Sequence, residues 1–201
     1  LITPPKAFFN GFDGNDYRKE VTFLIVDRAG VPYTSWSSPT PHYAKLCRFP
    51  GPNRIPSVDF DDSDLNVTLF RFAEVYLIAA EALNEVNNGP SAKAYEYINA
   101  VRARARNGAA GSGGSAVPAN LSTGMSKAVF LQAVLDERKW ELCFEMKRWY
   151  DIKRHNLGST VFSTTGYDTF ANGNFTEADY LMPIPQTEVD KNENLTQNPG
   201  Y

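Results

Sequence analysis

The chain has 201 residues, of which 42% are hydrophobic and 21% charged, a composition typical of a folded domain that needs no disulfide bonds. Its formal net charge of −3 at pH 7 excludes a global field that would attract nucleic acid or an anionic membrane. No apolar run approaches the about 20 residues that a membrane-spanning helix needs. Aromatic residues make up 13% of the chain, and those in predicted loops indicate a binding face.

Residues 1–65 are predicted to form long, ordered loops. They hold eight of the thirteen prolines, and proline is excluded from helix interiors and central strands. The run VTFLIV at 21–26 is the exception, because its β-branched and aromatic residues favour a strand. The chain opens LITPPKAFFN, without a methionine or a signal peptide, and we expect a truncated or processed product whose targeting segment lay upstream.

Residues 69–87 and 91–106 are predicted to form a pair of antiparallel helices. Alanine, leucine and glutamate dominate the first helix, which the run NNGP at 87–90 ends. Ser91 can cap the second helix, and Asn-Gly after its last turn ends it. Apolar residues occur on nearly every face of the first helix, which predicts burial on several sides. Two helices joined by so short a loop lie side by side, as in a tetratricopeptide unit.

A Gly/Ser-rich connection at 107–125 leads to a third helical region, predicted over 126–155. Ser126 can cap its start, and the run Asn-Leu-Gly after it is a stop signal. The rest, 157–201, is predicted to be extended, with a short turn near 186–190. The predicted fold class is therefore mainly α, with tetratricopeptide-like helical pairs, long ordered loops and an extended C-terminal tail.

The stretch ERKWELCFEMKRWYDIKR, residues 137–154, decides between a catalytic and a structural helix. Glutamates one turn apart reach the separation of a glycosidase acid pair. However, the same helix supplies basic partners three or four residues away: Arg138 for Glu141, Arg148 for Glu145 and Lys147 for Asp151. Neighbouring guanidinium groups lower a carboxyl pKa, whereas a general acid needs a raised one, so the helix is predicted to be structural. Some of its arginines are expected to pair with Glu74 or Glu81 of the first helix.

The same stretch resembles the helix of SusD/RagB-type proteins, whose pattern runs E-R-x-x-E-L-x-F-E-x-x-R-W-x-D-L-K-R, with Ile152 here where leucine is usual. Three more segments resemble family motifs in the expected order: RFAEVYLIAAEALNEV at 71–86, VRARA at 101–105 and LMPIPQTEVDKNENLTQNPGY at 181–201. On these four motifs, the chain is identified as a member of the SusD/RagB family, of which it resembles the C-terminal portion.

The resemblance implies a surface-exposed outer-membrane lipoprotein of Bacteroidetes that binds glycans, or peptides in some members, and covers a TonB-dependent, SusC-like transporter. In the family, a lipid-anchored cysteine and further helical pairs precede this portion, so neither Cys47 nor Cys143 is expected to be the lipidated residue. We expect three segments: a loop-rich, ligand-facing segment at 1–65, a helical scaffold at 66–156, and a tail at 157–201 that packs on the helices.

The motif residues are expected to build the scaffold, while aromatic side chains of the loops meet the ligand. Sugar C–H faces stack on such rings while polar neighbours bond the hydroxyl groups. The run VPYTSWSSPTPHY at 31–43 holds the main candidates: Trp36, Tyr33, Tyr43, Ser35, Ser37, Ser38 and His42. The alternative is that Trp36 only anchors a proline-rich loop to the core. Two lesser candidate edges hold further aromatic and polar residues: Tyr17, Asp13, Asn15 and Asp16 in one, and Tyr167, Phe170, Asn172 and Asn174 in the other.

Three other patterns are predicted to have no ligand role. The run VDFDDSDL at 58–65 has aspartates at calcium-loop spacing but lacks the glycine at the sixth position, and Phe70 stands where a bidentate glutamate belongs. Helix capping is predicted there, and no metal site or cofactor. The run VRARAR spreads its arginines around a helix, so no nucleic-acid partner is predicted. Cys47 and Cys143 are expected to be unpaired thiols.

Three functions compete on this sequence: glycan capture without catalysis, a helical-repeat module that binds only protein, such as the transporter, and a hydrolase. Loop aromatics favour the first over the second, and the paired acids disfavour the third. The prediction is a non-catalytic glycan-binding protein of the outer-membrane surface that delivers polysaccharide fragments to the transporter. A peptide-binding family member is the alternative.

Overall fold

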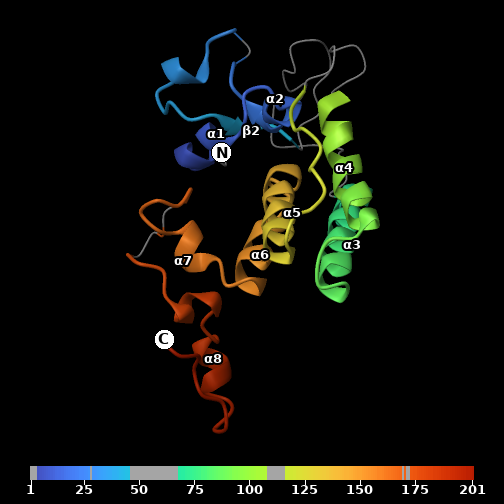
Figure 1. Ribbon diagram of the computed structural model, residues 1–201. Coiled ribbons are helices and arrows are strands. Elements are labelled where there is room, and N and C mark those ends of the chain that lie inside the picture. Colours follow the sequence, from blue (N-terminus) through green and yellow to red (C-terminus); the bar gives the residue numbers. More distant parts are fainter. Residues whose placement is uncertain (1–3, 28, 46–67, 108–115, 169, 171–172) are drawn as a thin grey trace. The chain divides into compact units, whose positions relative to one another are not determined.

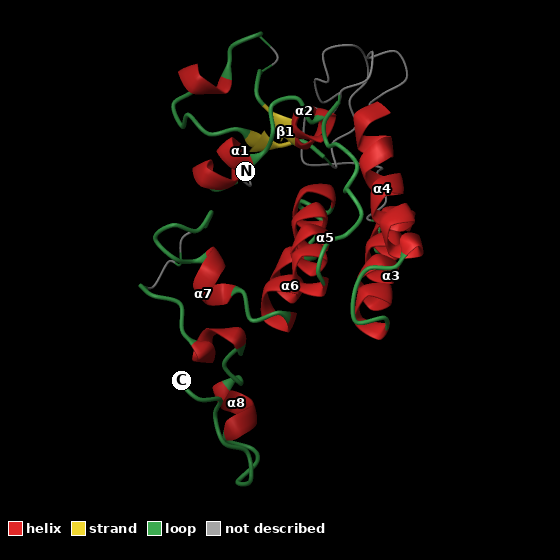
Figure 2. Ribbon diagram, viewed as in Figure 1, coloured by secondary structure: helices red, strands yellow, loops and turns green. Residues whose placement is uncertain are grey.

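The computed structural model describes residues 4–27, 29–45, 68–107, 116–168, 170 and 173–201 (Figure 1). Helices dominate this part of the chain, and its paired strands form one short two-stranded sheet (Figure 2). The chain divides into two compact units, Leu1–Arg148 and Trp149–Tyr201. The predicted mainly α fold is confirmed.

Three helices build the core of the first unit: α3 (Phe72–Val86), α4 (Ala92–Asn107) and α5 (Lys127–Glu141). The Ser91 hydroxyl accepts a hydrogen bond from the Ala94 amide at 3.2 Å, and the Ser126 hydroxyl accepts one from the Val129 amide at 3.3 Å. Both predicted caps are therefore confirmed. The core of buried side chains draws on all three helices: Leu77, Ala80, Ala94, Tyr95, Ile98, Val101, Phe130 and Val134.

α3 has one buried face and one exposed apolar face. It packs against both α4 and α5, with Leu77 and Ala80 fully buried. Phe72, Val75 and Ile78 are between 48% and 69% exposed. Within the residues that the structure describes, α3 is therefore less covered than its apolar pattern predicts.

The predicted continuous helix over 126–155 is wrong, because the chain turns between Leu142 and Lys147. α5 ends at Glu141, and α6 (Arg148–Arg154) begins after the turn. Phe144 and Met146 adopt positive φ angles of 62° and 58°, which an α-helix does not allow. The turn brings the Phe144 ring to 4.4 Å from the ring of Tyr43, between centroids, and this long-range packing offsets the local strain.

Short elements make up the N-terminal part of the first unit: α1 (Lys6–Gly11), α2 (Tyr17–Thr22), β1 (Phe23–Leu24), the 3-10 turn η1 (Tyr33–Ser35) and β2 (His42–Tyr43). β1 and β2 pair antiparallel. The strand predicted over 21–26 is thus reduced to two residues, because Val21 and Thr22 complete α2.

Aromatic packing joins these short elements to α5. Phe8 and Phe12 contact Trp140 of α5 with ring centroids 5.2 and 4.7 Å apart. Phe23 of β1 is buried, and its ring lies edge-on to that of Phe9 at 5.1 Å. The prediction of loops over 1–65 is therefore wrong at α1 and α2, and aromatic packing is what holds these short elements against α5.

The second unit contains α6 from Trp149 onward, α7 (Gly158–Val161), the 3-10 turn η2 (Glu177–Tyr180) and α8 (Gln186–Val189). Its small core is built around Ile152, Val161 and Tyr180, and the Tyr180 hydroxyl accepts a hydrogen bond from the Gly158 amide at 2.7 Å. The Gln197 side chain bonds both the amide and the carbonyl of Ile184, which closes the tail on itself. α8 confirms the turn predicted near 186–190.

Some sequence predictions fall outside the described residues: the aspartate run at 58–65, Cys47, Asn172 and residues 108–115 of the Gly/Ser-rich connection. Cys143, which the structure describes, is a buried free thiol. Its burial raises its pKa to about 12. This thiol is therefore neutral at physiological pH and has the character of a core side chain.

Candidate functional site

The two-stranded sheet and the turn that follows it position the candidate site. Leu24 of β1 lies directly opposite His42 of β2. The chain then turns at Asp27, whose Oδ1 accepts hydrogen bonds from the amides of Ala29 and Val31 at 2.8 and 2.9 Å. An aspartate that bonds amides two and four residues ahead stabilises a tight turn. The turn returns the chain to η1 and the segment that carries Trp36.

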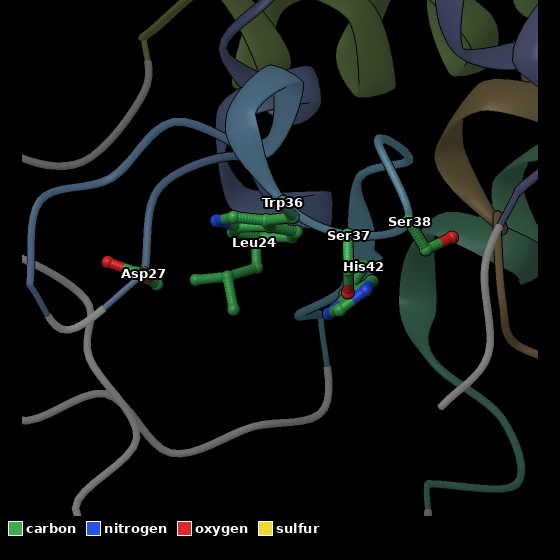
Figure 3. Close-up of a pocket in the computed structure, with 6 residues that line it drawn as sticks. All are labelled: Leu24, Asp27, Trp36, Ser37, Ser38 and His42. Carbon is green, nitrogen blue, oxygen red and sulfur yellow. The ribbon is translucent and has the colours of Figure 1, made fainter.

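A pocket of about 460 Å³ opens at this place (Figure 3). Its described lining combines an indole, a carboxylate, two hydroxyls, an imidazole and an aliphatic side chain: Trp36, Asp27, Ser37, Ser38, His42 and Leu24. In the close-up, the Trp36 indole lies between Asp27 on one side and Ser37, Ser38 and His42 on the other. Apolar surface with a few polar groups is the usual composition of a small-molecule site.

Trp36 is held in place and also lines the pocket. Its indole Nε1 donates a hydrogen bond to the Val31 carbonyl at 3.1 Å. Its ring lies 4.6 Å from the His42 ring and 6.4 Å from the Tyr33 ring, between centroids. Tyr33 in turn contacts Phe9 at 5.5 Å. The structure thus brings Tyr33, Trp36 and His42 together, and the anchoring role of Trp36 coexists with its place in the pocket.

The other candidate residues lie elsewhere. Tyr43 follows His42 in β2, so its side chain points to the opposite face of the strand, where it packs on Phe144. Tyr17 is the first residue of α2 and is not among the described residues that line the pocket. Tyr167 lies in the second unit and packs against that unit's own core.

The polar neighbours proposed for Tyr17 have structural partners. The Asp16 carboxylate is buried and bonds the Arg18 guanidinium at 2.6 Å, and it also caps α2 through the Arg18 amide. Asp13 accepts a hydrogen bond from the Asn15 amide. A buried, paired carboxylate is not accessible to a sugar, so Asp16 does not form a ligand edge.

Beneath the sheet, carboxylates of α5 and of the turn after it form a buried network with basic side chains. Arg18 Nη1 lies 2.5 Å from Glu137 Oε1 and 3.0 Å from Glu141 Oε2. Glu141 also pairs with Arg71 and Arg104, and Glu137 with Arg102. The prediction of ion-paired charges is confirmed, but these partners of Glu137 and Glu141 come from segments distant in the chain, and not from the same helix as the sequence predicted.

The network also bears out the pairing with α3, and it lowers the pKa values of Glu141 and Glu145. Arg138 lies 4.0 Å from Glu74, one of the two acids named from the sequence. Burial alone would raise the pKa of Glu141, but the charges of its arginine partners outweigh burial and lower it below its ordinary value. The pKa of Glu145 is lowered in the same way by Arg71 and Lys45. These carboxylates are ionised at neutral pH and have no proton to donate.

Sequence reasoning missed two residues of the pocket, Leu24 and Asp27, and two cations beneath it, Arg18 and Lys45. The pattern D-x-x-G at 27–30 is a turn signal that would have placed Asp27 beside the Trp36 segment. No local signal identifies Arg18 or Lys45, because their partners lie about a hundred residues away in the chain.

Metal-ligand clusters and membrane-spanning helices are both absent from the described residues. There, no group of three or more histidine, cysteine, aspartate or glutamate side chains is arranged to hold a metal ion. None of the helices in the described ranges has the length and apolar character to cross a bilayer.

Comparisons with known proteins place the chain among longer relatives. The model of the SusD family matches residues 15–201. SusD-like protein P2 of Formosa agariphila is 39% identical, over 100% of this chain and 40% of that protein. Starch-binding protein SusD of Bacteroides thetaiotaomicron is 28% identical, over 69% of this chain and 22% of that protein. A SusD superfamily structure from Parabacteroides distasonis covers 99% of this chain and 42% of its own, with TM-score 0.67 and 26% identity. The chain therefore spans less than half the length of these relatives.

Proposed function

Because the chain belongs to the SusD family, we propose that it supplies the ligand-binding face of a non-catalytic glycan-binding protein at the bacterial cell surface. The Trp36 pocket is the proposed site, with Trp36, Tyr33 and His42 as its aromatic groups. Tyr43, Tyr17 and Tyr167 are left outside it. The observation that carries the proposal is the half-buried indole beside hydroxyl, imidazole and carboxylate groups in one pocket.

The chemistry of the pocket suits an oligosaccharide. A pyranose presents C–H bonds on its faces and hydroxyls at its edge, so it stacks on an indole while the edge bonds polar neighbours. Ser37, Ser38 and His42 are placed to accept or donate such bonds. A relative at 28% identity is named starch-binding protein, which supports glucose-based oligosaccharides as the first ligands to test.

The proposal includes the absence of catalysis. Glycosidases need a carboxylic acid that is protonated at working pH, whereas the pKa values of Glu141 and Glu145 are lowered by their basic partners. Both acids lie in the network that holds the fold together. A test is to incubate the pure protein with oligosaccharides and measure new reducing ends; their release would overturn this part.

We further propose that the whole protein works as the family resemblance implies. It would be attached to the outer membrane by an N-terminal lipid anchor and deliver polysaccharide fragments to a TonB-dependent, SusC-like transporter. A helical-repeat module that binds only protein is the second candidate, favoured by the exposed Phe72, Val75 and Ile78 on α3. A peptide in place of the glycan is a variant of the first candidate and belongs in the same binding screen.

The central experiment is calorimetric titration of wild type and Trp36→Ala with a panel of malto-, xylo- and β-gluco-oligosaccharides. Loss of the stacking ring is expected to weaken binding by about tenfold or more. Tyr150→Ala, which removes a 68% exposed aromatic ring of the second unit, is the control and should leave affinity unchanged. Equal affinity of Trp36→Ala and wild type, with circular dichroism unchanged, would remove the pocket from consideration.

A further inference from the structure

β1 and β2 lie beneath the Trp36 pocket. A cationic side chain near each strand bonds to the C-terminal end of α5. On the β1 side, Arg18 lies in α2, which runs into β1 without an intervening residue. Its guanidinium bonds Glu137 at 2.5 Å and Glu141 at 3.0 Å. Its other nitrogens bond Asp16, so the Arg18 side chain is buried with an acceptor for each of its nitrogens.

On the β2 side, the connection is made by Lys45, two residues after Tyr43. Its Nζ lies 2.5 Å from the Glu141 carbonyl, 3.3 Å from the Cys143 carbonyl and 2.5 Å from Glu145 Oε1. Glu141 therefore binds Arg18 with its carboxylate and Lys45 with its backbone carbonyl. One residue of α5 thus binds a cation from the side of each strand.

The path from these cations to the pocket is short. The Ala44 amide donates to the Thr22 carbonyl at 2.9 Å, which joins the end of β2 to the end of α2. The pair Phe23 and Tyr43 follows along the sheet, and after it Leu24 lies opposite His42, and these two line the pocket. Each strand of this sheet has only two residues, so the pairing between the strands is weak. The register of the sheet therefore depends on contacts that each strand makes with other parts of the fold.

Apolar contacts also hold the sheet, but apolar packing does not depend on the orientation of the groups in contact. The Phe23 and Tyr43 rings lie 5.9 and 4.4 Å from the Phe144 ring. Such packing resists separation but permits sliding, whereas charge-assisted hydrogen bonds require particular donor and acceptor positions. The packing is thus expected to keep the sheet attached, and the cations to set its orientation.

We propose that Arg18 and Lys45 are positioning residues of the ligand pocket, which hold Leu24 and His42 in register beneath Trp36. This inference rests on the proposed function of the pocket. Neither residue is among the described residues that line the pocket. Loss of either is expected to weaken binding beyond what a general loss of stability explains.

The test uses Lys45→Met as the main variant, because Lys45 is less deeply enclosed than Arg18 and Lys45→Met leaves the Arg18 contacts intact. Affinity for the best-bound oligosaccharide of the panel should fall about tenfold, since small misplacements of binding groups are costly. Lys45→Arg should restore most of it. Arg104→Met removes another cation from Glu141 without touching the sheet, and Ile98→Ala lowers stability from the distant helical core; both should bind as wild type does.

Amide hydrogen exchange gives a readout that needs no ligand. In Lys45→Met the Ala44 and Tyr33 amides, which bond across this region, should exchange about tenfold faster, and in Arg104→Met they should not. Wild-type exchange and wild-type affinity in a folded Lys45→Met protein would overturn the inference. If Trp36→Ala binds as wild type does, the proposed function fails, while the exchange result still decides whether Lys45 positions the sheet.

Discussion

Glu137→Gln should be among the most damaging single changes in the first unit, although it leaves the side-chain shape almost unaltered. Glu137 is fully buried on α5 and pairs with Arg18 and Arg102, whose side chains are 5% and 18% exposed. The amide removes the negative charge and leaves two poorly hydrated cations. Removing one partner of a buried ion pair costs about 3–5 kcal/mol. Arg18 retains Asp16 and Glu141, so the lower end, about 3 kcal/mol, is expected here.

The assay is urea unfolding at neutral pH, followed by far-ultraviolet circular dichroism. Thermal melting should show the same loss as a fall in Tm of about 6–12 °C. Asp136→Asn is the matched control, one residue earlier on the same helix. Its carboxylate is 41% exposed and pairs with Lys139, so it should cost less than about 1 kcal/mol. Equal losses in the two variants would show that burial does not set the strength of these ion pairs.

Four further outcomes are expected. Glu141 and Glu145 have pKa values lowered below the ordinary 4.5. Their ionised forms therefore stabilise the fold fully above pH 4.5, and this stabilisation is lost as the pH falls through their folded-state pKa values. A urea unfolding midpoint that stays unchanged down to strongly acid pH would contradict this. The raised pKa of Cys143 predicts that iodoacetamide modifies it only after unfolding, as read by mass spectrometry. Ile98→Ala should cost about 3 kcal/mol in urea unfolding because it opens a cavity in the core. Val75→Ala, on the exposed face of α3, should change stability by less than about 0.5 kcal/mol.

The sequence predicted those elements whose signals are local. α3 and α4 were placed within three residues at each end, because alanine-rich periodicity, the Ser91 cap and the NNGP stop all lie within a few residues of what they specify. The four motifs identified the SusD family for the same reason, since each is a short run in order along the chain. Even the role of the charges was predictable, because acids and arginines at such density on a helix with buried apolar residues have to pair.

The break after Glu141 was not predictable in this way. The residues from Leu142 to Lys147 include no glycine or proline, and each is compatible with a helix. Phe144 nevertheless takes a positive φ to pack on Phe23 and Tyr43, residues about a hundred positions earlier. Local preferences here are worth less than the burial of an aromatic ring, so the tertiary contact decides the backbone.

The candidate site shows the same division. Trp36, Tyr33 and His42 were predicted from the aromatic run at 31–43 together with the family resemblance, but only the folded chain separates Tyr43 from them and adds Leu24 and Asp27. Arg18 meets Glu137 across 119 residues of sequence. By itself, the sequence determined where α3 and α4 lie, which family the chain belongs to and that its charges must be neutralised. The tertiary structure decided which charges form ion pairs and which rings share a pocket. Both depend on contacts between segments far apart in the chain, and such contacts produce no pattern in the local sequence.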